Sequence, residues 1–115
     1  MNSNKTKGDR AEREAAELLQ NLTGYQVRRA LGAGRTNESG GDVGDLEGIP
    51  GHSVQIANWK NTASAAIKKP PEAEQQRKNA NKPFAATLVR FRGGTYRVVL
   101  TPAQWAKYIK LIFNP

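Results

Sequence analysis

The fold is decided by residues 45–57, whose sequence is DLEGIPGHSVQIA. Residues 45–47 and 53–57 are short runs in which apolar and polar side chains alternate, as is typical of strands. Between them, residues 48–51 have the glycine and proline content of a tight turn. The sequence therefore predicts a β-hairpin, and alternate side chains of its second strand point to the same face.

This hairpin carries a candidate metal site. Cleavage of a phosphodiester with a divalent ion requires hard oxygen ligands that converge on one point, and a group that positions or deprotonates water. Asp45 and Gln55 can face the same ion, and the main-chain carbonyl of Ile56 is a further candidate ligand. Asp42 competes with Asp45, but Asp42 lies among glycines whereas Asp45 leads into a strand.

The position two residues after Gln55 lacks the side chain that the chemistry of such a site requires. A lysine there would point toward the same ion as Gln55, because strand side chains repeat every second residue. Position 57 is alanine instead. His52, the only histidine, is interpreted as a turn residue, and Gln75 and Gln76 are further side chains that can face the site.

The charge distribution indicates a polyanionic partner. The 115 residues hold 18 Lys and Arg against 10 Asp and Glu, a net charge of +8. Residues 1–55 hold 7 basic and 8 acidic side chains (net −1), and residues 56–115 hold 11 basic and 2 acidic (net +9). A surface this basic on a small domain is typical of nucleic-acid binding. The acidic side chains gather where the candidate metal site lies.

Around the hairpin, the chain length and pattern predict one domain, residues 1–115, without repeats. A helix is expected over residues 7–19, with Gly24 as its stop, then a short strand at 25–29 and a loop at 32–44. After the hairpin, residues 58–69 lack a clear period. A polar helix is predicted from Pro70-Pro71 to about Asn79, followed by strands at 84–91 and 95–100 across a Gly93-Gly94 turn. A last helix is predicted to run to about Phe113. It begins with Thr101 as N-cap, Pro102 at the first position and Gln104 in a capping box.

The order αβββαββα and two motifs resemble the PD-(D/E)XK nucleases. Residues 7–13, KGDRAER, are similar to the K-G-x-x-x-E-R start of the archaeal Holliday junction resolvases and their phage relatives. Residues 41–51, GDVGDLEGIPG, followed by the strand around Gln55, resemble the phage-type members. The likeness covers nearly the whole chain. It implies an α/β restriction-endonuclease-like fold, with a mixed central sheet flanked by helices.

The resemblance also implies roles for individual residues. Glu12 would reach from the first helix to a metal or its water, Asp45 would be the central ligand, and Gln55 would occupy the E/Q position. Mg²⁺ or Mn²⁺ would activate water for in-line attack, and a homodimer would cut two strands of a four-way junction. Lys7, Arg10 and Arg13 would lie close to the phosphates.

Two explanations of Ala57 remain open. Lys60 can replace the missing lysine if the chain bends at Asn58-Trp59, because in a regular strand Lys60 would face the wrong way. Alternatively, lysine was changed to alanine deliberately to trap an inactive protein, and we favour this because the surrounding positions, Asn58 included, keep the family pattern. Gln55 is either native or a second such change.

We therefore expect a structure-selective endonuclease of the Holliday junction resolvase type that hydrolyses DNA with a divalent metal and is inactive with alanine at position 57. The alternatives are a catalytically dead DNA-binding module of the same fold and a restriction or nicking nuclease. DNA, branched or duplex, and a second copy are the expected partners. We expect no membrane association and a cytoplasmic location, that of the host cell if a phage encodes the chain. Basic residues expected to contact DNA are Lys7, Arg10, Arg13, Arg28, Arg29, Arg35, Lys60, Lys68, Lys69, Arg77 and Lys78.

Overall fold

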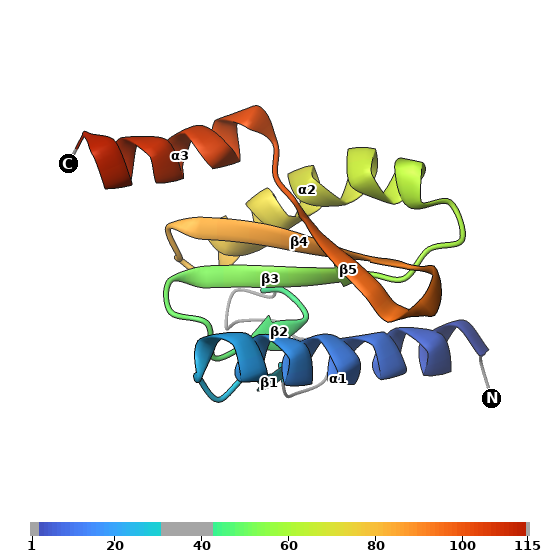
Figure 1. Cartoon of the computed structure of the whole chain (residues 1–115). Helices are drawn as coiled ribbons and strands as arrows, with labels where there is room; N and C mark the ends of the chain where they lie inside the picture. The colour runs from blue at the N-terminus through green and yellow to red at the C-terminus, as the bar shows by residue number, and fades with distance from the viewer. Residues whose placement is uncertain (1–2, 31–42, 115) are drawn as a thin grey trace.

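The computed structural model describes residues 3–30 and 43–114, with side chains from residue 8 onward (Figure 1). The predicted order of helices and strands is confirmed. The elements are α1 (Ser3–Thr23), β1 (Arg28–Arg29), β2 (Leu46–Glu47), β3 (His52–Ala57), α2 (Thr62–Asn79), β4 (Phe84–Phe91), the short 3₁₀ helix η2 (Arg92–Gly94), β5 (Thr95–Val99) and α3 (Pro102–Phe113).

The strands form one mixed sheet in the order β1-β2-β3-β4-β5. The β3–β4 pair is parallel and the other pairs are antiparallel. A parallel pair needs a long crossover, and α2 provides it. In Figure 1, α1 and α2 lie on opposite sides of the sheet. The chain is thus an α/β domain with a mixed sheet between helices, as expected.

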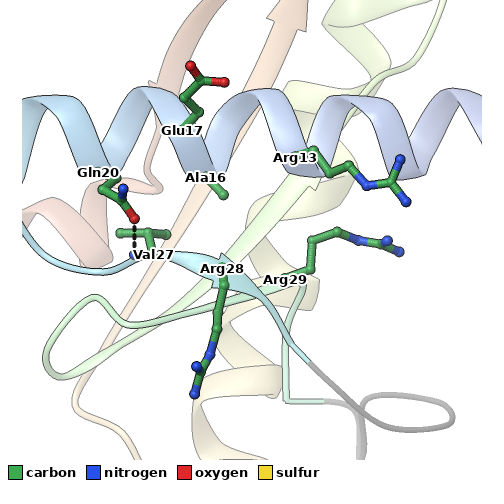
Figure 2. A pocket seen from close by; sticks show the side chains of 7 residues that line it. All are labelled: Arg13, Ala16, Glu17, Gln20, Val27, Arg28 and Arg29. Atoms are coloured by element: carbon green, nitrogen blue, oxygen red, sulfur yellow. Dashed lines mark hydrogen bonds between the residues drawn. The ribbon is translucent and has the colours of Figure 1, made fainter.

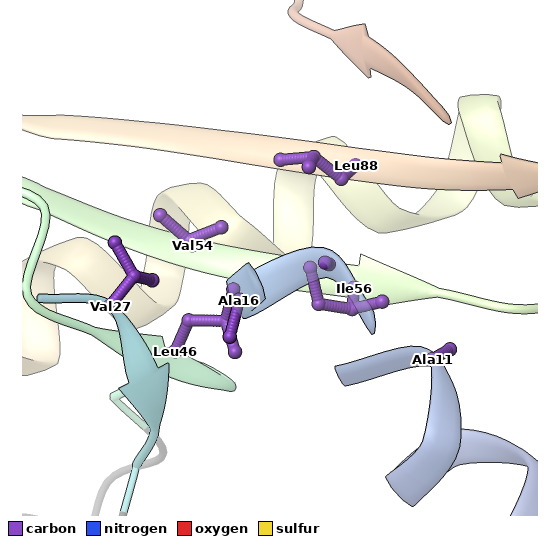
Figure 3. Packing of buried hydrophobic residues seen from close by; sticks show 8 residues of the cluster. Ala11, Ala16, Val27, Leu46, Val54, Ile56 and Leu88 are labelled. Carbon is purple, nitrogen blue, oxygen red and sulfur yellow. The ribbon is translucent and has the colours of Figure 1, made fainter. Parts of the chain in front are cut away.

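The core consists of two buried clusters, one on each face of the sheet. Figure 3 shows the larger one, in which α1 packs on β1, β2, β3 and β4 through residues such as Val54, Ile56 and Leu88. The smaller cluster joins β3 and β4 to α2 through Ala57, Val89 and Ala65. Eight of the fourteen buried hydrophobic residues in the described ranges are alanine. The core therefore brings the elements close together but buries few large side chains.

Helix α2 begins earlier than predicted. It starts at Thr62 rather than at Pro70, and the side chain of Asn61 caps it by accepting a hydrogen bond from the Ser64 N–H (2.9 Å). The prolines lie inside the helix, although each removes a backbone donor. Burial of Ala65, Pro70 and Ala73 along the helix compensates for this loss, because tertiary packing supplies most helix stability.

The other boundaries agree more closely with expectation. α1 extends beyond residues 7–19 at both ends, and Gly24, with φ +80° and its N–H bonded to Gln20 O (2.8 Å), follows its last residue. β4 has the predicted bounds. The capping box of α3 is present, with Thr101 and Gln104 bonded to each other's backbone. Most of the predicted loop at 32–44 lies outside the described residues.

Candidate functional site

Asp45 is fixed at the start of β2 by hydrogen bonds to both neighbouring strands. Its N–H donates to Val54 O (2.8 Å), and its carbonyl accepts from the Ala30 N–H (2.9 Å). Its carboxylate accepts a hydrogen bond from the main-chain N–H of Ile56 at 2.8 Å. The carboxylate therefore lies beside the peptide that links Gln55 to Ile56, as the predicted hairpin requires.

Gln55 occupies the middle of β3 and faces α2. Its neighbour Val54 belongs to the cluster under α1, so the alternation of strand side chains turns Gln55 to the other face. Leu46 pairs with Val54, and the same antiparallel register places Asp45 opposite Gln55. Gln55 is 5% exposed, and its Oε1 has no hydrogen-bond partner among the described residues. The two central candidates are therefore cross-strand neighbours.

Gln76 on α2 joins this neighbourhood, and Gln75 does not. Gln76 is buried, and its Oε1 lies 3.6 Å from the point where a Cβ on Gly44 would stand. Gly44 directly precedes Asp45 and has φ +108°. Gln75 is exposed and donates to Asn79 Oδ1 at 3.0 Å. Adjacent residues of a helix point in different directions, so the register of α2 determines that Gln76 faces the sheet and Gln75 faces solvent.

Glu12 takes part in an ion-pair network with β1. Its Oε1 accepts from Arg29 Nε (3.0 Å), and Arg29 Nη2 lies 2.8 Å from Asp9 Oδ1. Arg29 pairs with Leu46, whose side chain is in the cluster under α1. The structure thus brings Asp45 and Gln55 together, whereas the Glu12 carboxylate is bound to Arg29 on the α1 side. A metal-binding role for Glu12 stays a prediction.

Ala57 is enclosed by the cluster between the sheet and α2. It is 1% exposed and packs with Ala65 and Val89, with Trp59 against them. A lysine here would have to extend its stem past these neighbours. Lys60 follows the end of β3 and is exposed, so strand alternation no longer determines its direction.

An open cleft of about 430 Å³ separates α1 from β1 and is lined by three arginines. Figure 2 shows Arg13 and Arg29 extending in the same direction, whereas Arg28 points away from α1. Arg28 forms an ion pair with Glu47 (2.7 Å), and Arg29 is bound to the acids of α1. Arg13 is exposed. Among the described residues, Arg13 is therefore the cleft arginine that forms no ion pair, whereas Arg28 is exposed but paired with Glu47.

The remaining predicted DNA contacts fall into three groups. Two are bound to acids of α2, since Lys69 lies 3.4 Å from Glu72 and Arg77 Nε lies 2.7 Å from Glu74. The side chain of Lys7 and all of Arg35 lie outside what the structure describes, as does Asp42, the competing candidate for the metal ligand Asp45. The exposed group comprises Arg10, Lys60, Lys68 and Lys78.

Among the described residues, no three His, Asp or Glu side chains gather into a metal-binding cluster. None of the helices in these ranges combines the length and apolar character needed to span a membrane. No family model, curated protein or solved structure matches the chain.

Proposed function

We propose that this chain is a metal-dependent endonuclease domain of PD-(D/E)XK type, related in mechanism to the Holliday junction resolvases. The observation that carries the proposal is the Asp45 carboxylate, held by the Ile56 N–H beside the buried amide of Gln55. The order αβββαββα, with a β2–β3 hairpin and a crossover helix after it, supports the finer fold assignment.

The donor set around Asp45 fits Mg²⁺ or Mn²⁺. Hard cations of this kind take oxygen ligands, keep several waters and use one or two carboxylates together with substrate phosphates. Asp45 supplies the carboxylate, and Gln55 supplies an amide oxygen that is buried without a hydrogen-bond partner in the described part of the chain. Burial of such an oxygen is unfavourable unless it has a partner, and a cation would be one.

In this site the bound ion would polarise the scissile phosphate and lower the pKa of an attacking water. Asp45 and Gln55 would hold the ion, and the Ile56 N–H would fix the orientation of the Asp45 carboxylate. Gln76, next to Gly44, would hold water or a phosphate oxygen on the α2 side of the site. Glu12 would join by turning from Arg29 to the metal or its water, a step that approach of an anionic phosphate to Arg29 would favour.

The substrate we propose is branched DNA. The second half of the chain carries a net charge of +9, and phosphate contacts from such a surface recognise backbone and shape rather than sequence. A homodimer would present two such surfaces and two sites, as a four-way junction requires. Arg10, Arg13, Lys60, Lys68 and Lys78 are the exposed cations that we assign to backbone contacts.

One observation favours a second candidate, a DNA-binding module without catalysis. Position 57, where a catalytic lysine is expected, is a buried alanine packed against Ala65. Such packing suits a native alanine, and without the lysine the site lacks a group that stabilises developing charge. The domain would then bind junctions and leave cleavage to another protein.

Cleavage of a synthetic four-way junction in Mg²⁺ or Mn²⁺ tests the proposal. We expect the chain with Ala57 to bind the junction with little cleavage, and Ala57→Lys, alone or with Gln55→Glu, to cleave it. Asp45→Asn added to the active variant should abolish cleavage. A linear duplex of the same sequence separates junction resolution from restriction or nicking activity.

Circular dichroism of each variant checks folding, since Ala57 is buried. If folded Ala57→Lys and Ala57→Lys/Gln55→Glu bind the junction but cut nothing, the enzyme proposal is wrong and the binding module stands.

A further inference from the structure

The chain buries small apolar residues and exposes large ones. Its buried hydrophobic set in the described ranges is mostly alanine, valine and leucine, and contains no aromatic residue. On α3, by contrast, Trp105 is 60% exposed, Ile112 65% and Phe113 79%. Trp105, Ile109 and Ile112 are spaced by four and three residues, so they share one face of the helix. α3 thus has an apolar face that the described part of its own domain does not cover.

An apolar groove lies next to this face. It has a volume of about 360 Å³ and runs between the end of α1, the sheet and α3. Its walls include Leu19 of α1, Val54 of β3, Leu88 of β4 and Val98 of β5. α1 covers the β1–β3 part of this face of the sheet, and the groove opens over β4 and β5. Trp105 belongs to both surfaces, so the groove and the α3 face are continuous.

α3 is attached to its own domain mainly near its first turns. Gln104 Nε2 donates to Pro70 O and Glu74 Oε1 (both 3.1 Å), and the Tyr108 hydroxyl lies 2.6 Å from His52 Nε2. Beyond Tyr108, α3 continues along the upper part of Figure 1 toward the C-terminus. Its exposed apolar residues after that point are Ile109, Leu111, Ile112 and Phe113.

We propose that a second copy of this chain covers this surface, so that the apolar face of α3 in each copy packs into the groove of the other. A two-fold arrangement needs one self-complementary patch, and a continuous ridge and groove on the same chain provide it. The proposed function needs two active sites for one four-way junction, and this interface would supply them. The role of the dimer in cleavage therefore rests on the proposed function.

Charge identifies the occupant as a copy rather than an acidic partner. Two chains of +8 repel each other, so a second copy meets the least repulsion at an uncharged surface. The groove lining contains no Lys, Arg, Asp or Glu. An anionic partner such as DNA or an acidic membrane would instead be drawn to the basic surfaces.

The number of large exposed apolar side chains also favours a dimer. Exposed apolar patches on monomers rarely exceed a few hundred Å², whereas a stable interface buries roughly 800 Å² on each partner. Six large apolar side chains contribute here, each at least 39% exposed: Val98, Trp105, Ile109, Leu111, Ile112 and Phe113. Because the core is poor in large residues, burial of these six would add the apolar contact that the single domain lacks.

Sedimentation equilibrium of the full chain, without DNA or metal, tests the proposal separately from nuclease activity. We expect the wild type to have twice the 12.6 kDa mass of one chain, and Ile112→Glu to shift the mass to that of one chain. Ile67→Glu is the matched control, because Ile67 is 75% exposed on α2, which covers the opposite face of the sheet. This control should leave the mass at that of the dimer.

If Ile112→Glu does not fold, the urea midpoint of the wild type, measured at several protein concentrations, decides the matter. The midpoint of a dimer rises with protein concentration, and that of a monomer does not. A concentration-independent midpoint, a dimeric Ile112→Glu variant or a monomeric wild type would each overturn the proposal. So would a monomer that floats with phosphatidylcholine–phosphatidylglycerol vesicles, since a lipid surface would then be the occupant.

Discussion

Asp45 is the residue on which the chemical proposal depends. Asn at this position keeps an oxygen that can accept the Ile56 N–H, but it removes the charge that a divalent cation requires. We therefore expect Asp45→Asn to abolish Mn²⁺ binding, measured by titration calorimetry, while the melting temperature changes little. Glu47→Gln, which removes a carboxylate from β2 that pairs with Arg28, should retain metal binding. Unfolding of Asp45→Asn would instead indicate a structural role for this carboxylate.

Glu14 makes the stability of the chain dependent on pH. Hydrogen bonds from Arg90 Nε (2.7 Å) and the Tyr96 hydroxyl (2.7 Å) lower the pKa of Glu14 below 4.5 and outweigh the opposing effect of burial. Because the pKa is lower in the folded state, the contribution of Glu14 is present above about pH 4.5 and is lost as pH falls through the lowered value.

Glu14→Gln should therefore flatten the loss of stability below pH 4.5, measured by urea unfolding across the acid range. The side chain is 41% exposed, so solvent screening keeps the effect to about 0.5–1 kcal/mol. Glu74, whose pKa is lowered by its hydrogen bond from Arg77, leaves a residual slope. Glu17→Gln, an exposed change on the same helix, serves as control. An unchanged acid profile in Glu14→Gln would contradict this assignment.

At the scale of the elements, the turn of the β2–β3 hairpin depends on a close approach to β1. Gly48 has φ +112°, and a Cβ there would stand 2.0 Å from the carbonyl oxygen of Gln26. Because the obstacle is backbone, the segment that leads into β1 would have to move, and the residues that follow it bind Glu12 through Arg29 and Asp45 through the Ala30 N–H.

We expect Gly48→Ala to destabilise the domain by about 3 kcal/mol or more, measured by thermal unfolding. Gly24→Ala is the matched control, because Gly24 also has positive φ (+80°) but nothing lies within 4 Å of its Cβ position. Its cost should be limited to the strain of the left-handed conformation, about 1–2 kcal/mol. Equal effects of the two changes would show that the approach to Gln26 is not what restricts position 48.

At the scale of the whole molecule, the net charge of +8 should govern the DNA binding that we propose. Each phosphate neutralised by the protein releases counterions, so the logarithm of the affinity falls linearly with the logarithm of salt concentration. We expect a steep slope for a four-way junction, measured by fluorescence anisotropy. Arg13→Gln should lower this slope by about 1, because Arg13 is exposed in the α1–β1 cleft and forms no ion pair with a described residue.

Lys110→Gln on α3 removes the same charge at a position that we do not assign to DNA, and it should leave the slope unchanged. Binding that is insensitive to salt would remove the basis for the phosphate contacts.

The sequence by itself determined the elements and their order. The caps and stops that did so are local, as in Thr101 with Gln104 and in Gly24, and β4 is a mostly apolar run of eight residues. The sequence also predicted the hairpin that sets Asp45 beside Gln55, because strand alternation and a short turn fix that geometry over only ten residues.

Only the tertiary structure decided which candidate site residues lie close together and which apolar surfaces remain exposed. The ion pair of Glu12 with Arg29 joins residues 17 apart, and the burial of Ala57 depends on α2, whose start the sequence placed eight residues too late. The exposed face of α3 depends likewise on what the rest of the chain fails to cover. Periodicity and caps are properties of neighbouring residues, whereas ion pairs, burial and uncovered surface arise when distant segments pack together.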